Sequence, residues 1–134
     1  MATQYSTTVR NAANDQIQTT IGTAPLLKFY TGSVPATCAT AVSGTLLISI
    51  TLPSTWLGAS SSGVKSLSGT WSGTASGTGT AGYYRIYDST GTTCHEQGTI
   101  TATGGGGDIT LDNTSIASGQ TVTVSTYTKT FSGA

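Results

Sequence analysis

The chain has 134 residues, of which 36% are hydrophobic and 7% are charged, and its five basic and five acidic side chains cancel. This length fits one domain with its own core, and the composition excludes the kind of disorder that combines low hydrophobicity with high net charge. The zero net charge and the scattered positions of the five basic residues argue against the basic surface that a nucleic-acid-binding protein needs. The longest apolar run, residues 46–52, is too short to span a membrane.

The first residues contain no basic segment followed by an apolar run, so no signal peptide is predicted and we expect the chain to be made and folded in a cytoplasm. A helix is predicted over residues 6–21, with Ser6 as its cap and with Gly22 and Pro25 ending it. Its apolar residues recur at every fourth position and share one face: Val9, Ala13, Ile17 and Ile21.

This apolar stripe is narrow, so the helix is marginal alone and must pack on its own domain or on another subunit. The sequence leaves both alternatives open. Tyr5, just before the helix, is an amphipathic aromatic of the kind that is enriched at interfaces. Tyr5 and the stripe are therefore the candidate protein-interface residues. We expect residues 1–22 to form a helical arm and residues 23–134 to form a β domain.

After Pro25 the sequence is rich in Thr, Ser and Gly, and short apolar or alternating runs predict strands at 26–30, 45–52, 64–71, 83–87, 93–101, 109–111 and 121–131. The run 45–52 is nearly continuous in Leu and Ile, which indicates a central strand. Its period of two places Leu46, Ile48, Ile50 and Leu52 on one buried face, with Leu47 on the other.

Residues 72–82 are of low complexity and are expected to be a long exposed loop, whereas residues 88–91 are typical of a hairpin turn. The number of strands and the chain length favour a mainly β fold. The predicted architecture is an antiparallel two-sheet sandwich of the jelly-roll type with one N-terminal α-helix.

The only histidine, His95, lies between Cys94 and Glu96 in a predicted strand. Neighbouring residues in a strand point to opposite faces, so these three side chains cannot form a metal site or a Cys–His nucleophile pair. The sequence predicts no catalytic residue, no metal ligand and no cofactor, and we expect that the protein is not an enzyme.

The only two cysteines are Cys38 and Cys94. Free thiols are the ordinary state of a protein that is folded in a reducing cytoplasm, whereas a particle exposed to air can oxidise them later. A disulfide between the two therefore stays open as the alternative.

Five aromatic residues also leave two interpretations open, since they can form a surface that stacks on sugars or pack in the core and between strands. They are Trp56, Trp71, Tyr83, Tyr84 and Tyr87.

Six segments together carry a resemblance that covers almost the whole chain. They are QYSTTVRNA (4–12), TTIG (19–22), LPSTW (52–56), GTAGYYRIY (79–87), GTTCH (91–95) and TATGGGGDITLDN (101–113). The set resembles a family of small structural proteins of tailed bacteriophages and prophages. That family is similar to the jelly-roll cement, or decoration, proteins of phage capsids.

The resemblance implies a virion structural protein that stabilises the capsid through protein–protein contacts. Its partners would be a major capsid protein of the HK97 type and copies of itself in a homo-oligomer, with no nucleic acid, membrane or cofactor. It would be made in the bacterial host cytoplasm and would lie on the outer surface of the capsid. The alternatives are a head-fibre, tail-fibre or tail component that binds host surface glycans, and a small tail or connector subunit.

Overall fold

The computed structural model of the protein describes residues 3–131 and 133. It contains one helix and short strands, so the predicted mainly β class with an N-terminal helix is confirmed. In chain order the elements are α1 (Thr7–Ile21), β1 (Leu26–Thr31), β2 (Leu46–Thr51), β3 (Val64–Ser66), β4 (Trp71–Thr74), β5 (Gly79–Tyr87), β6 (Cys94–Ala102), β7 (Ile109–Leu111), β8 (Ser115–Ile116), β9 (Thr121–Val124) and β10 (Thr128–Thr130).

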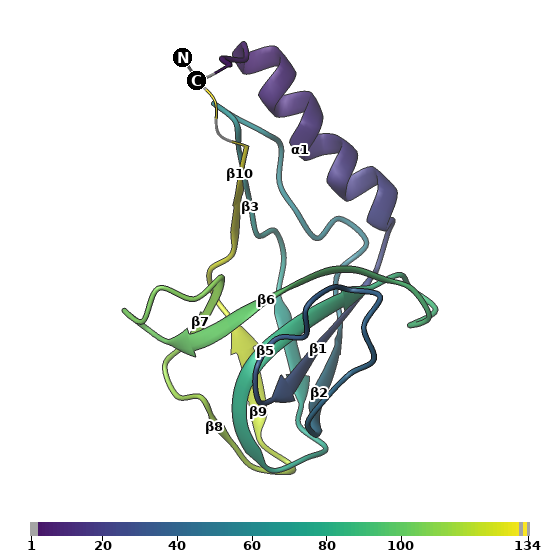
Figure 1. Cartoon of the computed structure of the whole chain (residues 1–134), viewed down its shortest axis with the longest axis vertical. Helices are drawn as coiled ribbons and strands as arrows, with labels where there is room; N and C mark the ends of the chain where they lie inside the picture. Colours follow the sequence, from purple (N-terminus) through teal and green to yellow (C-terminus); the bar gives the residue numbers. More distant parts are fainter. Residues whose placement is uncertain (1–2, 132, 134) are drawn as a thin grey trace.

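The main sheet has the strand order β2-β1-β5-β6-β7, with β8 paired to the start of β5. Its neighbours are antiparallel except β6 and β7, which run parallel. Two further two-stranded sheets, β10-β3 and β4-β9, complete the fold. The main sheet curls around the core, and the helix projects from this body beside β3 and β10 (Figure 1). The sheets are open, so a jelly-roll sandwich is not confirmed.

The helix begins and ends where the sequence predicts. The Ser6 hydroxyl accepts a hydrogen bond from the Val9 amide at 3.2 Å, which satisfies one of the free donors of the first turn. Gly22 follows the last turn with a φ of 93°, a backbone conformation that favours glycine. Its amide donates to the Gln18 carbonyl, so the helix stops without leaving that carbonyl unpaired.

The prediction that residues 45–52 form a central strand is wrong in its position, because β2 lies at one end of the main sheet. Half of its residues are nevertheless buried, and the amides of Ser76 and Gly77 bond to the Leu47 carbonyl at 2.9 and 3.0 Å on its free edge. Leu46 is 38% exposed, against the prediction, while Leu47 and Ile48 are both fully buried. A register shift in the pairing with β1 breaks the simple alternation at this point.

The expected exposed loop at 72–82 is also wrong, because β4 and the start of β5 lie within it. Its small residues are required by close packing. A Cβ at Gly73 would lie 3.1 Å from a side-chain carbon of Ile50, and a Cβ at Gly82 would collide with the Gly32 carbonyl. Low complexity here reflects backbone segments in close approach. The predicted final strand over 121–131 is likewise divided, into β9 and β10, which belong to different sheets.

The hairpin predicted at 88–91 is confirmed. It joins β5 to β6, its Gly91 has a φ of 75°, and the Gly91 amide donates to the Asp88 carbonyl at 2.9 Å. The core inside the curled sheet is apolar and aromatic. The largest fully buried side chains, all of which except Tyr83 belong to this core, are Trp56, Trp71, Tyr83, Phe29, Leu27, Leu47, Ile48, Ile50, Leu52, Leu57, Ile86 and Ile109.

Candidate protein-docking surface on the helix

The N-terminal and middle turns of the helix pack on its own domain through polar side chains. Asn14 is 1% exposed, and its side-chain amide donates to the Gly63 carbonyl at 2.6 Å. The Gly63 amide in turn donates to the side-chain oxygen of Asn11 at 2.8 Å. One turn earlier, the Arg10 guanidinium donates to the Ser62 carbonyl at 3.1 Å. The polar side chains of α1 therefore satisfy the backbone of the loop before β3.

An ion pair extends this polar contact. Lys65, in β3, donates to the Asp15 carboxylate at 2.7 Å, and the Ser60 hydroxyl donates to the same oxygen at 2.6 Å. The hydrogen bond from Lys65 holds the pKa of Asp15 below its ordinary value, and the hydrogen bond from Ser60 has a smaller effect in the same direction. The Lys65 side chain is only 5% exposed, while that of Asp15 is 56% exposed. The carboxylate of Asp15 therefore pairs with a buried ammonium group.

The C-terminal end of the helix is fixed to the core. Ile21 is buried and belongs to the core cluster, and half-buried Ile17 packs against that cluster. The Gln18 side chain donates to the Leu57 carbonyl at 3.3 Å. The indole of Trp56 donates to the Gly22 carbonyl at 3.0 Å, so the connection to β1 is held as well.

This packing leaves much of the apolar face on the outside. Val9 is 48% exposed and Tyr5 is 44% exposed, while Ala13 is half-buried. A groove of about 240 Å³ continues the face toward the main sheet, where it reaches exposed His95 in β6. The groove is lined by Ala13, Gln16, Ile17, Thr20, Ile21 and His95. We call Tyr5, Val9, Ala13 and this groove the helix stripe.

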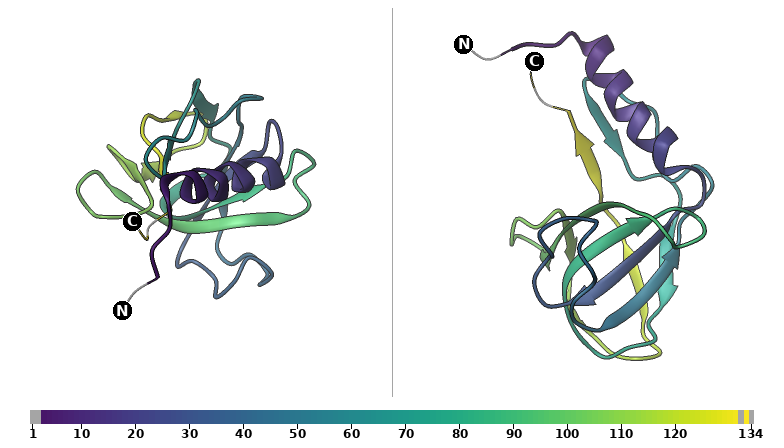
Figure 2. Two further views of the ribbon diagram at one scale, coloured as in Figure 1. Left: turned by 90° about the horizontal axis from the view of Figure 1, so that it is seen from above. Right: turned by 45° about the vertical axis from the view of Figure 1, so that its right-hand side comes forward.

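Of the five candidate interface residues, the structure brings Tyr5, Val9 and Ala13 to the exposed side and turns Ile17 and Ile21 toward the domain. The start of the arm is tied to the C-terminal segment, since the Tyr5 amide donates to the Gly133 carbonyl at 2.6 Å. The rings of Tyr5 and Phe131 also meet edge to face, with centroids 5.7 Å apart. In the right-hand view of Figure 2 the helix lies beside β3, and its C-terminal end is the end nearer the main sheet.

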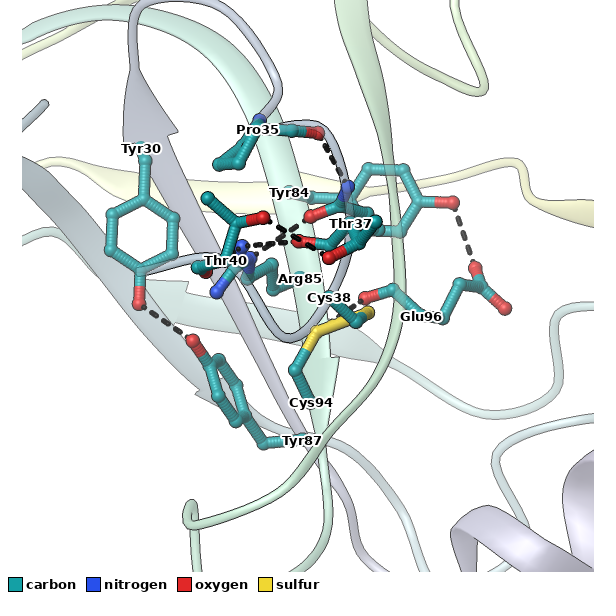
Figure 3. Close-up of a disulfide and its surroundings, with 11 residues drawn as sticks. Tyr30, Pro35, Thr37, Cys38, Thr40, Tyr84, Arg85, Tyr87, Cys94 and Glu96 are labelled. Carbon is teal, nitrogen blue, oxygen red and sulfur yellow. Dashed lines mark hydrogen bonds between the residues drawn. A yellow bond between two sulfur atoms is a disulfide. The ribbon is translucent and has the colours of Figure 1, made fainter. Parts of the chain in front are cut away.

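Of the two alternatives for the cysteines, the structure has the disulfide. Cys38 and Cys94 are joined with their Cα atoms 5.4 Å apart, although 56 positions separate them in sequence. The connection between β1 and β2 folds back over the sheet to reach β6 (Figure 3). The buried guanidinium of Arg85 holds this connection, because it donates to the carbonyls of Thr37 and Thr40 at 3.1 and 2.7 Å.

Glu96 belongs to a network that fixes β10 on the main sheet. Its carboxylate accepts hydrogen bonds from the hydroxyls of Tyr84, at 2.7 Å, and Tyr127, and it pairs with the ammonium of Lys129. Burial, reinforced by the negative charge of Glu96, raises the pKa of both tyrosines. Both phenols therefore stay neutral donors at ordinary pH. No group of three or more His, Cys, Asp or Glu side chains within residues 3–131 and 133 is placed to hold a metal ion.

The five aromatic residues that could have formed a sugar platform are buried instead. Trp56, Trp71 and Tyr83 are 0% exposed, and Tyr84 and Tyr87 are 3% and 8% exposed. The platform interpretation is therefore wrong, because a ring must present a free face to stack on a sugar. The sequence showed aromatic residues in strands but not which sheet face is covered.

Within the part of the chain that the structure describes, α1 is the only helix, and it is neither long nor apolar enough to cross a membrane. Comparisons of the chain with protein-family models, with curated proteins and with solved structures found no match in any of the three. The interpretation of the helix stripe therefore depends on its own geometry and on the sequence resemblance.

Proposed function

We propose that the protein is a bacteriophage virion structural protein that acts as a cement, or decoration, protein on the outer surface of the capsid. Its role is structural rather than catalytic. It binds the major capsid protein, of the HK97 type, and neighbouring copies of itself. The observation that carries this proposal is the exposure of Tyr5 and Val9 at the start of α1, where the side chains of Asn11 and Asn14 make the contact with the domain.

A surface helix usually turns its whole apolar stripe toward the core, whereas in α1 only Ile17 and Ile21 do so. An exposed apolar stripe on a helix whose polar face is already satisfied supports a second protein contact. The hydrogen bonds of Arg10, Asn11 and Asn14 order the helix before binding, which lowers the entropy cost of association. Each apolar side chain that becomes buried contributes about 1.5–3 kcal/mol at most, so one contact is weak and repetition over a lattice strengthens it.

Two further features support a place in a particle. Only 7% of the residues are charged and the net charge is zero, so copies can lie side by side with little repulsion. The disulfide suits a protein that works outside the reducing cytoplasm in which it is made. The proposal does not depend on a jelly-roll sandwich, which the open sheets do not confirm.

The test is an add-back experiment with particles that lack the protein. Purified wild-type protein and the variant Val9→Asp are each mixed with these particles, and the bound copies are measured after sedimentation. Thr8→Asp is the matched control, since Thr8 is an exposed neighbour in the first turn of the same helix. Both substitutions place a carboxylate near the helix N-terminus, where it is tolerated.

We expect Val9→Asp to lower the affinity at least tenfold, while its unfolding midpoint stays close to that of the wild type. Thr8→Asp should bind as the wild type does. If wild-type protein does not bind the particles, the proposed function is wrong. If both variants bind as well as the wild type, the placement of the contact on the helix stripe is wrong.

A further inference from the structure

Strands β7 and β9 each have one unpaired edge, and these edges flank the same groove. β7 is the last strand of the main sheet and pairs only with β6, and β9 pairs only with β4. No backbone hydrogen bond joins β7 to β9 among residues 3–131 and 133. Both strands are labelled on the body of the molecule in Figure 1, away from the helix.

A groove of about 250 Å³ lies between them. One wall is formed by Thr110, Asp112 and Asn113, and the other by Gln120, Thr121 and Thr123. Leu111, Val122 and Ser125 complete the lining, which is mostly polar. β7 has three residues and β9 has four, so each edge can pair with only a short stretch of another strand.

The ladder geometry shows which backbone groups face the groove. The Ala75 amide bonds to the Gln120 carbonyl at 2.8 Å, where the β4–β9 ladder ends. Bonded residues alternate along a strand, so Val122 and Val124 bond to β4, and the amides and carbonyls of Thr121 and Thr123 point to the free edge.

The same alternation applies to β7. The Thr103 amide bonds to the Leu111 carbonyl at 3.0 Å on the β6 side. The amide and carbonyl of the preceding residue, Thr110, therefore point to the groove. Free strand edges of this kind are templates for the addition of another strand.

The groove also carries an unbalanced charge. The Asp112 carboxylate accepts a hydrogen bond from the Thr103 hydroxyl at 3.2 Å. No lysine, arginine or histidine lies within ion-pair distance of Asp112 among the described residues, whose ion pairs are Lys65–Asp15 and Lys129–Glu96. A basic side chain in the occupant would complement this carboxylate.

We infer that the groove between β7 and β9 binds an extended polypeptide segment of another protein, which adds as a strand to the free edge of β9 and places a lysine or arginine beside Asp112. At the opposite end of the main sheet, the amides of Ser76 and Gly77 already bond to the Leu47 carbonyl of β2. The inference concerns a surface separate from the helix stripe and does not depend on the proposed function.

The probe for this site is a library of random linear peptides displayed on yeast and selected on the immobilised protein. We expect the enriched peptides to carry Lys or Arg and strand-forming residues. Adding the best of them to isotope-labelled protein should shift the amide resonances of Thr110, Thr121 and Thr123 and slow the hydrogen exchange of Thr121 and Thr123 at least tenfold. The amide resonances of α1 should not move.

Three variants make the test specific. Thr123→Pro removes the outward amide and should weaken the selected peptide at least tenfold, whereas Thr123→Ala keeps that amide and should bind within about twofold of the wild type. Asp112→Asn should weaken Lys- or Arg-containing peptides several-fold. If Thr123→Pro does not fold, the affinity of Asp112→Asn and the hydrogen-exchange measurement still test whether the peptide binds in this groove.

The inference is overturned if selection enriches no peptide. It is also overturned if the enriched peptides leave the three threonine amides unchanged or shift only the helix stripe. Since the proposed function is tested by Val9→Asp on particles, each of the two can fail without the other.

Discussion

Replacement of Asn14 by Ala tests whether the polar face of α1 is the packed face. Asn14 is 1% exposed and donates to the Gly63 carbonyl at 2.6 Å. That carbonyl also accepts from the Phe131 amide at 2.9 Å, so the substitution weakens its pairing without leaving it unpaired. The lost hydrogen bond costs about 0.5–1.5 kcal/mol, and the vacated volume costs roughly 1 kcal/mol more.

Alanine favours the helix over asparagine by about 0.6 kcal/mol, which offsets part of this loss. The net expectation is a decrease of about 1–2 kcal/mol in the free energy of unfolding. Urea denaturation followed by the fluorescence of the two buried tryptophans measures it, with the disulfide kept intact.

Val9→Ala is the matched comparison, since Val9 lies on the apolar face and is 48% exposed. It should change the free energy of unfolding by less than about 0.5 kcal/mol. A larger loss for Val9→Ala than for Asn14→Ala would mean that the apolar face packs on the domain, and the orientation of the helix described above would be refuted.

Three more predictions concern the core, the disulfide and pH. Ile48→Ala should lower the free energy of unfolding by about 2–5 kcal/mol in urea denaturation, because Ile48 is fully buried; a change below about 0.5 kcal/mol would contradict the burial of β2. Replacing both Cys38 and Cys94 by Ser should cost roughly 2–4 kcal/mol, because the bridge closes a loop between residues 56 positions apart, and an unchanged melting temperature would count against the bridge. The pairing of Asp15 with Lys65 lowers the folded-state pKa of Asp15, so its contribution to stability is present above the ordinary value of 3.8 and is lost as the pH falls through the lower folded-state pKa. The free energy of unfolding should therefore decrease below about pH 4, and Asp15→Asn should make this decrease smaller. Equal pH profiles for the wild type and Asp15→Asn would mean that the Asp15–Lys65 pair does not contribute to stability.

The sequence predicted the limits of the helix but not the face by which it packs. Ser6 and Gly22 act through hydrogen bonds and backbone angles within a few residues, so their effect can be predicted locally. The buried position of Asn14 depends on the Gly63 carbonyl, which lies 49 positions away in sequence. Hydrophobic periodicity cannot detect a helix that is anchored by polar contacts to a distant loop.

The β strands also divide into features set by local sequence and features set by contacts between distant segments. The hairpin at 88–91 was predicted because Asp88 and Gly91 define a turn by themselves. The edge position of β2 and the strands within 72–82 depend on pairings between segments far apart in the chain. Gly73 and Gly82 resemble loop residues in sequence, whereas close contact with Ile50 and Gly32 is what requires them.

The five candidate interface residues divide between the outer side and the core. Tyr5, Val9 and Ala13 lie on the outer side as an interface requires, but Ile17 and Ile21 turn toward the core. The contribution of His95 to the groove beside the helix had no signal in the sequence, because β6 reaches α1 only through the curl of the sheet. The groove between β7 and β9 was also missed, since polar residues at two strand edges resemble ordinary turns.

The central proposal, that this chain is a capsid cement protein, requires that a phage encode it, and its copy number in the purified virions of that phage tests the proposal most directly. Quantitative gel densitometry gives the molar ratio of this chain to the major capsid protein. A cement protein repeats over the capsid lattice, so we predict a ratio comparable to one. A ratio of a few hundredths, as expected of a tail, fibre or connector component, or the absence of the chain from the virion, would contradict the account.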